Sequence, residues 1–207
     1  MSGLVFPHLV LLVSTASASI HRWKAREEHI HFLSCTDVLT QVANRRHLMD
    51  TFDIELSRAQ RKKTHLSLMM VDLDHFKPVN DNYGHHAGDI ALKVAAGVLK
   101  MAVRKTDLVG RYGGEEFCII LPEADSAAAM QTAERCRSNL EQDDIDTGSK
   151  TIHITASFGL TTFNPDDEQI KENLNVDDFL KAADSALYVA KDSGRNQVIT
   201  AKLCPTS

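Results

Sequence analysis

The chain has few cysteines and no histidine pattern of the kind found in secreted proteins with disulfides or in proteins with structural metal sites. Only four of its 207 residues are cysteines, at Cys35, Cys118, Cys136 and Cys204. They are scattered, and no two have the CxxC spacing of a zinc or redox site, so we expect reduced thiols in a cytosolic protein. The ten histidines show no metal-ligand spacing either.

Positive charge is also scarce. Lysine and arginine total 23 against 28 acidic residues, which gives a formal net charge of -5. A general nucleic-acid binder usually carries a basic stripe, so we expect no nucleic-acid partner. A nucleotide enzyme needs only local positive charge and is not excluded. Apolar residues make up 43% of the chain, enough for a globular core, and the length fits one domain plus a short extension.

An apolar stretch without formal charge covers residues 3–20, and the basic segment His21-Arg22-Trp23-Lys24-Ala25-Arg26 follows it. Three interpretations stay open: a transmembrane helix end with a positive cytoplasmic flank, a signal peptide cut near Ala16-Ser17-Ala18, or a start inside a longer parent protein. Pro7 and His8 weaken the membrane interpretation, and no basic n-region precedes the stretch. We favour a fragment or a membrane-proximal segment.

A short helical pattern follows the apolar stretch. Ile20, Trp23, Glu27 and Ile30 have the 3-4-3 spacing of a heptad seam, which is typical of a coiled coil or of one face of an ordinary amphipathic helix. We therefore expect residues 1–34 to form an N-terminal helical extension, either a signalling helix or a membrane-proximal linker.

Helical and extended patterns alternate in the rest of the chain. Helices are expected at 44–62, 87–103, 126–140 and 176–191, and strands at 65–73, 106–110, 117–121, 151–163 and 197–200. An acidic loop is expected at 164–175. This order predicts an α+β domain in which helices flank a central, mainly antiparallel five-stranded sheet.

The most informative segment is Arg111-Tyr112-Gly113-Gly114-Glu115-Glu116-Phe117. Its paired glycines lie between two expected strands and supply the positive φ angles of a tight hairpin turn. A turn without side chains leaves room for a bulky anion beside the backbone, and the two acids after it can hold a hard cation. Taken alone, the segment also fits a solvated turn with two surface acids.

Two further clusters carry chemistry. Asp72 ends an apolar strand, where a carboxylate is costly unless it binds something, so it is a candidate metal ligand. Asp74 is the alternative ligand, and Asp72 would then only cap the strand. Lys191 and Arg195 lie four apart at the end of a helical stretch and can point two cations at one anion. The alternative for this pair is a solvated helix terminus.

These motifs resemble those of the GGDEF-domain diguanylate cyclases, in the GGEEF variant. The resemblance covers roughly Cys35 to Thr200 and rests on Asp37-Val38-Leu39-Thr40 with Asn44-Arg45-Arg46, Asp72 to Asp81, Gly84 to Asp89, Arg111 to Phe117, and Ala190 to Asn196. It implies the palm-like fold shared with class III nucleotidyl cyclases, in a GGDEF domain over residues 35–202.

The resemblance also implies an activity, the condensation of two GTP molecules to cyclic di-GMP with release of two pyrophosphates. Each 3′-hydroxyl would attack the α-phosphate of the other GTP. Two Mg²⁺ ions per active site, with Mn²⁺ as the alternative, would activate the hydroxyl and clamp the leaving oxygens. One domain holds one GTP, so we expect a homodimer. Such enzymes serve bacterial second-messenger signalling.

Site residues are carried over position by position. The implied catalytic residues are Asp72, Glu115, Glu116, Lys191 and Arg195. The implied metal ligands are Asp72, Glu115 and the backbone carbonyl of Leu73. The implied GTP-binding residues are Lys77, Asn80, Asp89, Arg111, Gly113, Gly114, Lys191 and Arg195. Asn80 and Asp89 would face the guanine edge, which favours cyclic di-GMP as the product, although Asn80 also fits a turn and Asp89 a helix N-terminus.

An inhibitory site is implied by the segment Arg104-Lys105-Thr106-Asp107, which resembles the RxxD motif through which cyclic di-GMP blocks turnover. Arginine can fork onto phosphate or guanine, and aspartate can accept from guanine. Arg135 would be a second arginine of this site, and Arg58 would come from a neighbouring subunit. Both also fit ordinary surface helical arginines.

Three functions therefore stay open at this point. The first is an active, product-inhibited diguanylate cyclase, since no catalytic position is degenerate. The second is a non-catalytic cyclic di-GMP receptor that binds through Arg104 and Asp107. The third is a cyclase of another product, which Asp89 disfavours. We expect a cytoplasmic protein, with membrane attachment through residues 3–20 and an upstream sensor as open alternatives.

Overall fold

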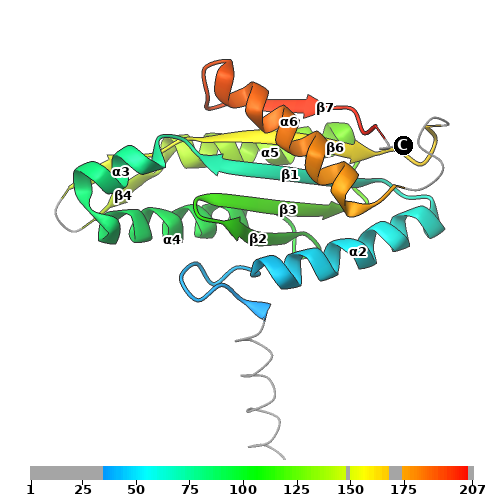
Figure 1. Ribbon diagram of the computed structural model, residues 1–207, viewed down its shortest axis with the longest axis horizontal. Helices are drawn as coiled ribbons and strands as arrows, with labels where there is room; N and C mark the ends of the chain where they lie inside the picture. The colour runs from blue at the N-terminus through cyan, green and yellow to red at the C-terminus, as the bar shows by residue number, and fades with distance from the viewer. Residues whose placement is uncertain (1–34, 148–149, 168–173, 205–207) are drawn as a thin grey trace, which may run out of the picture. The chain divides into compact units, whose positions relative to one another are not determined.

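The computed structural model describes residues 35–147, 150–167 and 174–204 (Figure 1). Apart from Cys35 and Thr36, these residues belong to one compact unit, Asp37–Ser207. The predictions for residues 1–34 lie outside the described residues. Among the described ranges, none of the helices combines the length and the apolar character that a membrane span requires.

Five strands form the central sheet in the order β2-β3-β1-β6-β7. Their bounds are β1 Leu66–Leu73, β2 Leu108–Gly113, β3 Glu116–Pro122, β6 Ala156–Phe163 and β7 Val198–Ala201. The β1–β3, β1–β6 and β2–β3 pairs are antiparallel, and only β6 and β7, of the five, pair in parallel. The predicted α+β architecture with a mainly antiparallel five-stranded sheet is confirmed.

Helices cover both faces of this sheet, with α6 in front of it and α5 behind it in Figure 1. The helices are α2 Arg45–Lys62, α3 Phe76–Tyr83, α4 His85–Ala102, α5 Ser126–Gln142 and α6 Val176–Asp192. Alternation along β1 separates two cores: Leu68 and Met70 pack with α2 and α6, whereas Met69 and Val71 pack with α4 and α5.

Three details differ from the sequence prediction. The expected strand 151–163 is two strands, because β5 (Thr151–His153) pairs with β4 (Asp144–Asp146) in a separate ribbon and β6 pairs with β1. The pattern did not predict β4. It did not predict α3 either, because no side chain caps this helix and Pro78 lies in its first turn.

The close approach of α6 to the sheet depends on a glycine. A Cβ on Gly159, in β6, would overlap the Ala183 carbonyl oxygen and the Leu187 backbone nitrogen of α6. At its N-terminus, α6 begins with a reciprocal capping box between Asn175 and Asp178. These features place the C-terminal end of α6 beside the end of β1 and the start of β3.

Candidate active site

Asp72 is the centre of the candidate site. It is only 7% exposed, and its Oδ2 lies 2.7 Å from the Nζ of Lys191 at the end of α6. Burial raises the pKa of Asp72 above its ordinary value, the charges of Glu115 and Asp74 add to this, and Lys191 opposes it. Asp72 is thus a partly desolvated carboxylate that already attracts one cation, the ammonium group of Lys191.

Glu116 faces Asp72 across the sheet. The two residues are direct partners in the antiparallel β1–β3 register, so their side chains lie on the same face, the one that α2 and α6 cover. Burial raises the pKa of Glu116, and the negative charges of Asp72, Asp184 and Glu115 add to this while Lys191 opposes it. Glu115 comes one residue before β3, and its carbonyl accepts from the Leu73 amide at 3.4 Å. The carboxylates of Asp72 and Glu116 thus lie on one face, and the charge of Glu115 acts on both.

Asp74 has a different environment. Its Oδ1 accepts from the Ser157 hydroxyl at 2.7 Å, and its Oδ2 accepts from the Thr155 hydroxyl at 2.7 Å and from the Asn196 backbone amide at 3.0 Å. Both oxygens are therefore engaged in holding the local fold. This supports Asp72, and not Asp74, as the metal-ligand candidate that the sequence left undecided.

The donor set at this edge suits a hard cation. Asp72, Glu115 and the Leu73 carbonyl offer oxygen atoms alone, which Mg²⁺ and Mn²⁺ prefer. Across the described ranges, no three His, Cys, Asp or Glu side chains already converge on one metal position. Mg²⁺ tolerates this, because it commonly takes one or two carboxylates and completes its shell with water and substrate phosphates. The residues present therefore fit the predicted metal.

The glycine turn is braced by Arg111. Gly114 has a φ of 43°, and the Gly114 carbonyl accepts from Arg111 Nε at 2.9 Å and Nη2 at 2.7 Å. The third guanidinium nitrogen lies 3.2 Å from Asp37 Oδ1. All these contacts shape the protein, so the predicted contact of Arg111 with GTP stays a prediction. Gly113 and Gly114 keep the turn free of side chains beside Glu116.

The predicted guanine-binding residues come together at α3 and α4. The Asn80 side chain lies against Gly88, where a Cβ would overlap the Asn80 Oδ1. The absence of a side chain at Gly88 therefore lets the Asn80 amide pack against α4, one residue before Asp89. Asp89 and Lys77 are exposed. The tight turn between the helices uses Gly84, which has a φ of 82°.

A loop after α6 carries Arg195. Gly194, Arg195 and Asn196 have φ values of 115°, 64° and 45°, three consecutive residues in the left-handed region. The Arg195 amide donates to the Ala190 carbonyl at 3.0 Å, and its side chain is exposed. Sequence reasoning did not assign a role to Asn196 or to the partners of Asp74. The Gly-Arg-Asn order was the only local signal for such a loop.

The predicted inhibitory residues divide into two groups. Arg104 and Asp107 lie in the turn between α4 and β2, where Asp107 Oδ2 accepts from the Arg104 amide at 2.8 Å. Arg135, on α5, donates to the carbonyl of Ala102 at 2.7 Å, two residues before Arg104. Arg58 lies on α2, which covers the other face of the sheet, and pairs with Glu55 at 2.8 Å.

Comparisons with known proteins agree with this geometry. A sequence profile described as "Diguanylate cyclase, GGDEF domain" matches residues 34–197. Diguanylate cyclase A of Treponema denticola is 38% identical over 174 residues, which is 82% of this chain and 45% of that protein. Diguanylate cyclase DosC of Escherichia coli K12 is 40% identical over 165 residues, 78% of this chain and 34% of that protein. The chain thus spans less than half the length of these relatives.

Solved structures show the same fold. The coiled coil and GGDEF domain of DgcB from Caulobacter crescentus, in complex with c-di-GMP, superposes with a TM-score of 0.81 at 28% identity, covering 93% of this chain and 99% of that one. The active GGEEF domain of a diguanylate cyclase from Vibrio cholerae superposes with a TM-score of 0.69 at 30% identity, covering 80% and 99%.

Proposed function

We propose that this chain, which belongs to the GGDEF family of diguanylate cyclases, condenses two GTP molecules to cyclic di-GMP and releases two pyrophosphates. The observation that carries the proposal is the pairing of Asp72 with Glu116 across β1 and β3, within the influence of the Glu115 charge and beside Lys191 and a side-chain-free glycine turn. A hard cation bound there supplies Lewis-acid activation of the 3′-hydroxyl and neutralises phosphate charge.

In this proposal the chain's own residues bind and orient GTP. Gly113 and Gly114 let the phosphates approach the backbone, while Lys77, Lys191 and Arg195 neutralise the β- and γ-phosphates. Asn80 and Asp89 pair with the guanine edge, because a carboxylate matches the N1–H and N2–H₂ donors that adenine lacks as a pair. These contacts hold the α-phosphate in line with an incoming hydroxyl.

Glu116 suits a proton-transfer role in the same site. Burial and the neighbouring carboxylates raise the pKa of Glu116 above its ordinary value, which makes this carboxylate a stronger base. Its position on the face of Asp72 places the acid beside the proposed metal and not behind the sheet.

Two GTP molecules require two copies of the site, so the proposal includes a homodimer in which each half presents one GTP to the other. Residues 35–202 would be the cyclase domain, and residues 1–34 would be a signalling helix or membrane-proximal linker that aligns the halves. Two divalent ions per active site complete the proposal.

Product inhibition is the regulatory part of the proposal. Arg104, Asp107 and Arg135 lie at the junction of α4 and α5, and they offer two guanidinium groups and one carboxylate to a guanine nucleotide. Arg58 would reach this product from the partner subunit, which fits its place on the other face of the sheet. Bound cyclic di-GMP would then hold the two active sites apart.

The test is to incubate the purified chain with GTP and Mg²⁺ and to identify the nucleotides by chromatography and mass spectrometry. Cyclic di-GMP that forms rapidly and then stalls supports both the active site and the product site. No product at any enzyme concentration, together with tight binding of added cyclic di-GMP, would instead favour a receptor that binds through Arg104 and Asp107.

A further inference from the structure

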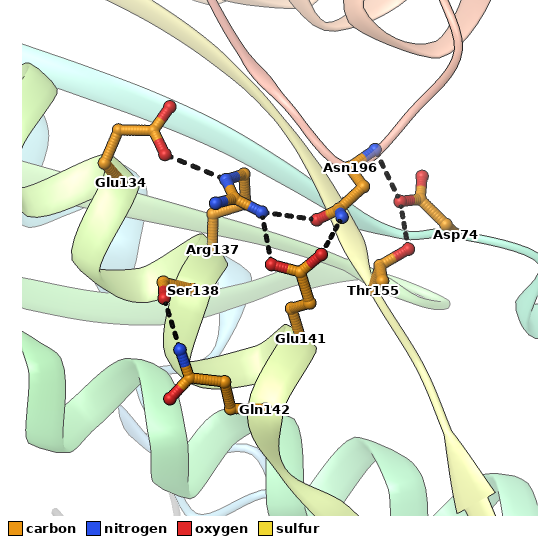
Figure 2. Close-up of polar contacts among 8 residues, drawn as sticks. All are labelled: Asp74, Glu134, Arg137, Ser138, Glu141, Gln142, Thr155 and Asn196. Carbon is orange, nitrogen blue, oxygen red and sulfur yellow. Dashed lines mark hydrogen bonds and ion pairs between the residues drawn. The ribbon is translucent and has the colours of Figure 1, made fainter.

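We infer that Arg137 and Glu141, on α5, are positioning residues for the loop that carries Arg195, and that they act by holding Asn196. This inference rests on the proposed function, because it takes Arg195 as a contact for the GTP phosphates. Figure 2 shows the contacts that join the helix to the loop.

Both polar atoms of the Asn196 side-chain amide form hydrogen bonds with residues of α5. Arg137 Nη1 donates to Asn196 Oδ1 at 2.9 Å, and Asn196 Nδ2 donates to Glu141 Oε1 at 2.7 Å (Figure 2). Each bond has one charged partner, which makes it stronger than a neutral bond of the same length. Two bonds of this kind fix the orientation of the amide as well as its position.

Arg137 is itself held in place. Its Nε lies 2.8 Å from Glu134 Oε2 and its Nη1 lies 2.9 Å from Glu141 Oε2, and its side chain is only 19% exposed. All three residues come from consecutive turns of α5. The guanidinium therefore presents a fixed donor to Asn196 and not a freely moving one, so the ordering cost of this contact is already met within the helix.

The backbone of Asn196 is held from the opposite side. The backbone amide of Asn196 donates to Asp74 Oδ2 at 3.0 Å, and the hydroxyl of Thr155 donates to the same oxygen at 2.7 Å (Figure 2). Asp74 comes two residues after Asp72, directly after the end of β1. Asn196 thus links α5 to the strand end that carries the proposed metal ligand.

The loop needs such support because of its backbone conformation. Arg195 and Asn196 have φ values of 64° and 45°, in the left-handed region, which is sterically unfavourable for residues other than glycine, although asparagine tolerates it better than most. The contacts from α5 and Asp74 offset this steric cost at Asn196. Arg195 is the preceding residue, so a fixed Asn196 sets the direction in which the Arg195 side chain leaves the loop.

The experiment measures two affinities for each variant, in the presence of Mg²⁺. One ligand is a GTP analogue with a non-cleavable α–β bridge, and the other is guanosine, whose weak binding is followed by NMR titration. Arg137→Ala and Glu141→Ala should each weaken binding of the GTP analogue about tenfold, because a charge-assisted bond is lost. Guanosine affinity should change less than about twofold, since α3 and α4 bind the base.

Gln142→Ala is the matched control. Gln142 lies on the same helix and donates to Ser138 Oγ at 2.9 Å, but this contact does not involve the loop (Figure 2). Both affinities of this variant should stay within about twofold of the wild type. Combining Arg137→Ala with Asn196→Ala should weaken the GTP analogue no further than Asn196→Ala alone, because both changes remove one shared support.

Glu141→Gln distinguishes a loss of the contact with Asn196 from a general folding defect, because it changes the side chain very little. The amide of glutamine keeps an acceptor for Asn196 but loses the charge that pairs with Arg137, so an intermediate loss of GTP-analogue affinity is expected. If Arg137→Ala leaves the ratio of the two affinities unchanged, the inference is overturned. If the wild-type chain binds no GTP analogue at all, the proposed function itself fails, and the two failures are thereby distinguishable.

Discussion

Two regions of the molecule, the proposed active site and the proposed product site, are held together by different kinds of contact. We call Asp72, Glu115, Glu116 and Lys191, the proposed catalytic residues, the catalytic edge, and Arg104 to Asp107 with Arg135, the proposed product site, the product turn. The edge gathers residues from β1, β3 and α6 around partly buried carboxylates of raised pKa. In the product turn, Arg104 to Thr106 are exposed, and the half-buried Asp107 accepts a hydrogen bond from the Arg104 amide. The edge therefore depends on sheet register and helix packing, whereas the turn depends mainly on neighbouring residues, with Arg135 added from α5.

The largest expected effect comes from removing the acids of the catalytic edge. Asp72→Ala combined with Glu115→Ala should lower cyclic di-GMP synthesis at least about a thousandfold. The proposed metal would lose both of its carboxylate ligands, so the charge of the GTP phosphates would no longer be neutralised. Binding of cyclic di-GMP to the product turn should persist, measured by calorimetry on the same variant. Wild-type synthesis rates in this variant, or the loss of both functions together, would contradict the separation of the two regions.

A packing change should damage the catalytic edge next. Gly159→Ala should destabilise the domain by about 3 kcal/mol, because the new methyl group meets the α6 backbone and moves the helix that carries Lys191. Denaturant unfolding measures this free energy. Gly97→Ala, on α4, is the matched control: no atom lies within 4 Å of its Cβ position, so it should stabilise the domain by about 0.5–1 kcal/mol. Equal stability of the two variants would refute this account of the close packing.

A change in the product turn should have a smaller effect, confined to regulation. Arg104→Ala should weaken cyclic di-GMP binding about tenfold, because one guanidinium contact to the nucleotide is lost. The plateau of product in a GTP assay should rise accordingly. Lys105→Ala is the matched control. It removes an exposed side chain next to Arg104 and should leave the final level of cyclic di-GMP unchanged. An unaltered plateau in Arg104→Ala would place the product elsewhere.

The smallest expected effect is a pH dependence of stability. The pKa of Asp72 is raised above its ordinary value of 3.8, so the folded state binds more protons than the unfolded state between the two pKa values, and wild-type stability falls as pH rises through that window. Asp72→Asn removes this loss. The melting temperature of Asp72→Asn relative to wild type should therefore be higher at pH 7 than at pH 3.5. A difference that is independent of pH would show that Asp72 titrates normally.

Local patterns predicted most of the elements. The bounds of α2, α4 and α6 fall within two residues of those expected, because apolar periodicity and capping residues act within a few positions. The hairpin at the glycine pair is present for the same reason. The split of the expected strand 151–163 was missed, because pairing partners decide where one strand ends and the next begins.

Local patterns were also insufficient to predict how the site residues are arranged. Because side chains alternate along a strand, Glu115 and Glu116 are expected to face opposite ways, but alternation does not indicate which of them shares a face with Asp72. The register of β1 with β3 answers this for Glu116. The choice between Asp72 and Asp74 likewise needed the donors of Thr155, Ser157 and Asn196, which come from distant parts of the chain.

The sequence by itself determined the fold class, the positions of most helices and strands, and the family to which the chain belongs, because periodicity, turn residues and motif spacing are local properties. Only the tertiary structure decided that Asp74 is hydrogen-bonded through both oxygens while Asp72 pairs with Lys191, which face Glu116 occupies, and which helix contacts the loop with Arg195. These depend on contacts between residues up to 122 positions apart, as between Asn196 and Asp74. Such contacts arise from chain packing, and no local pattern encodes them.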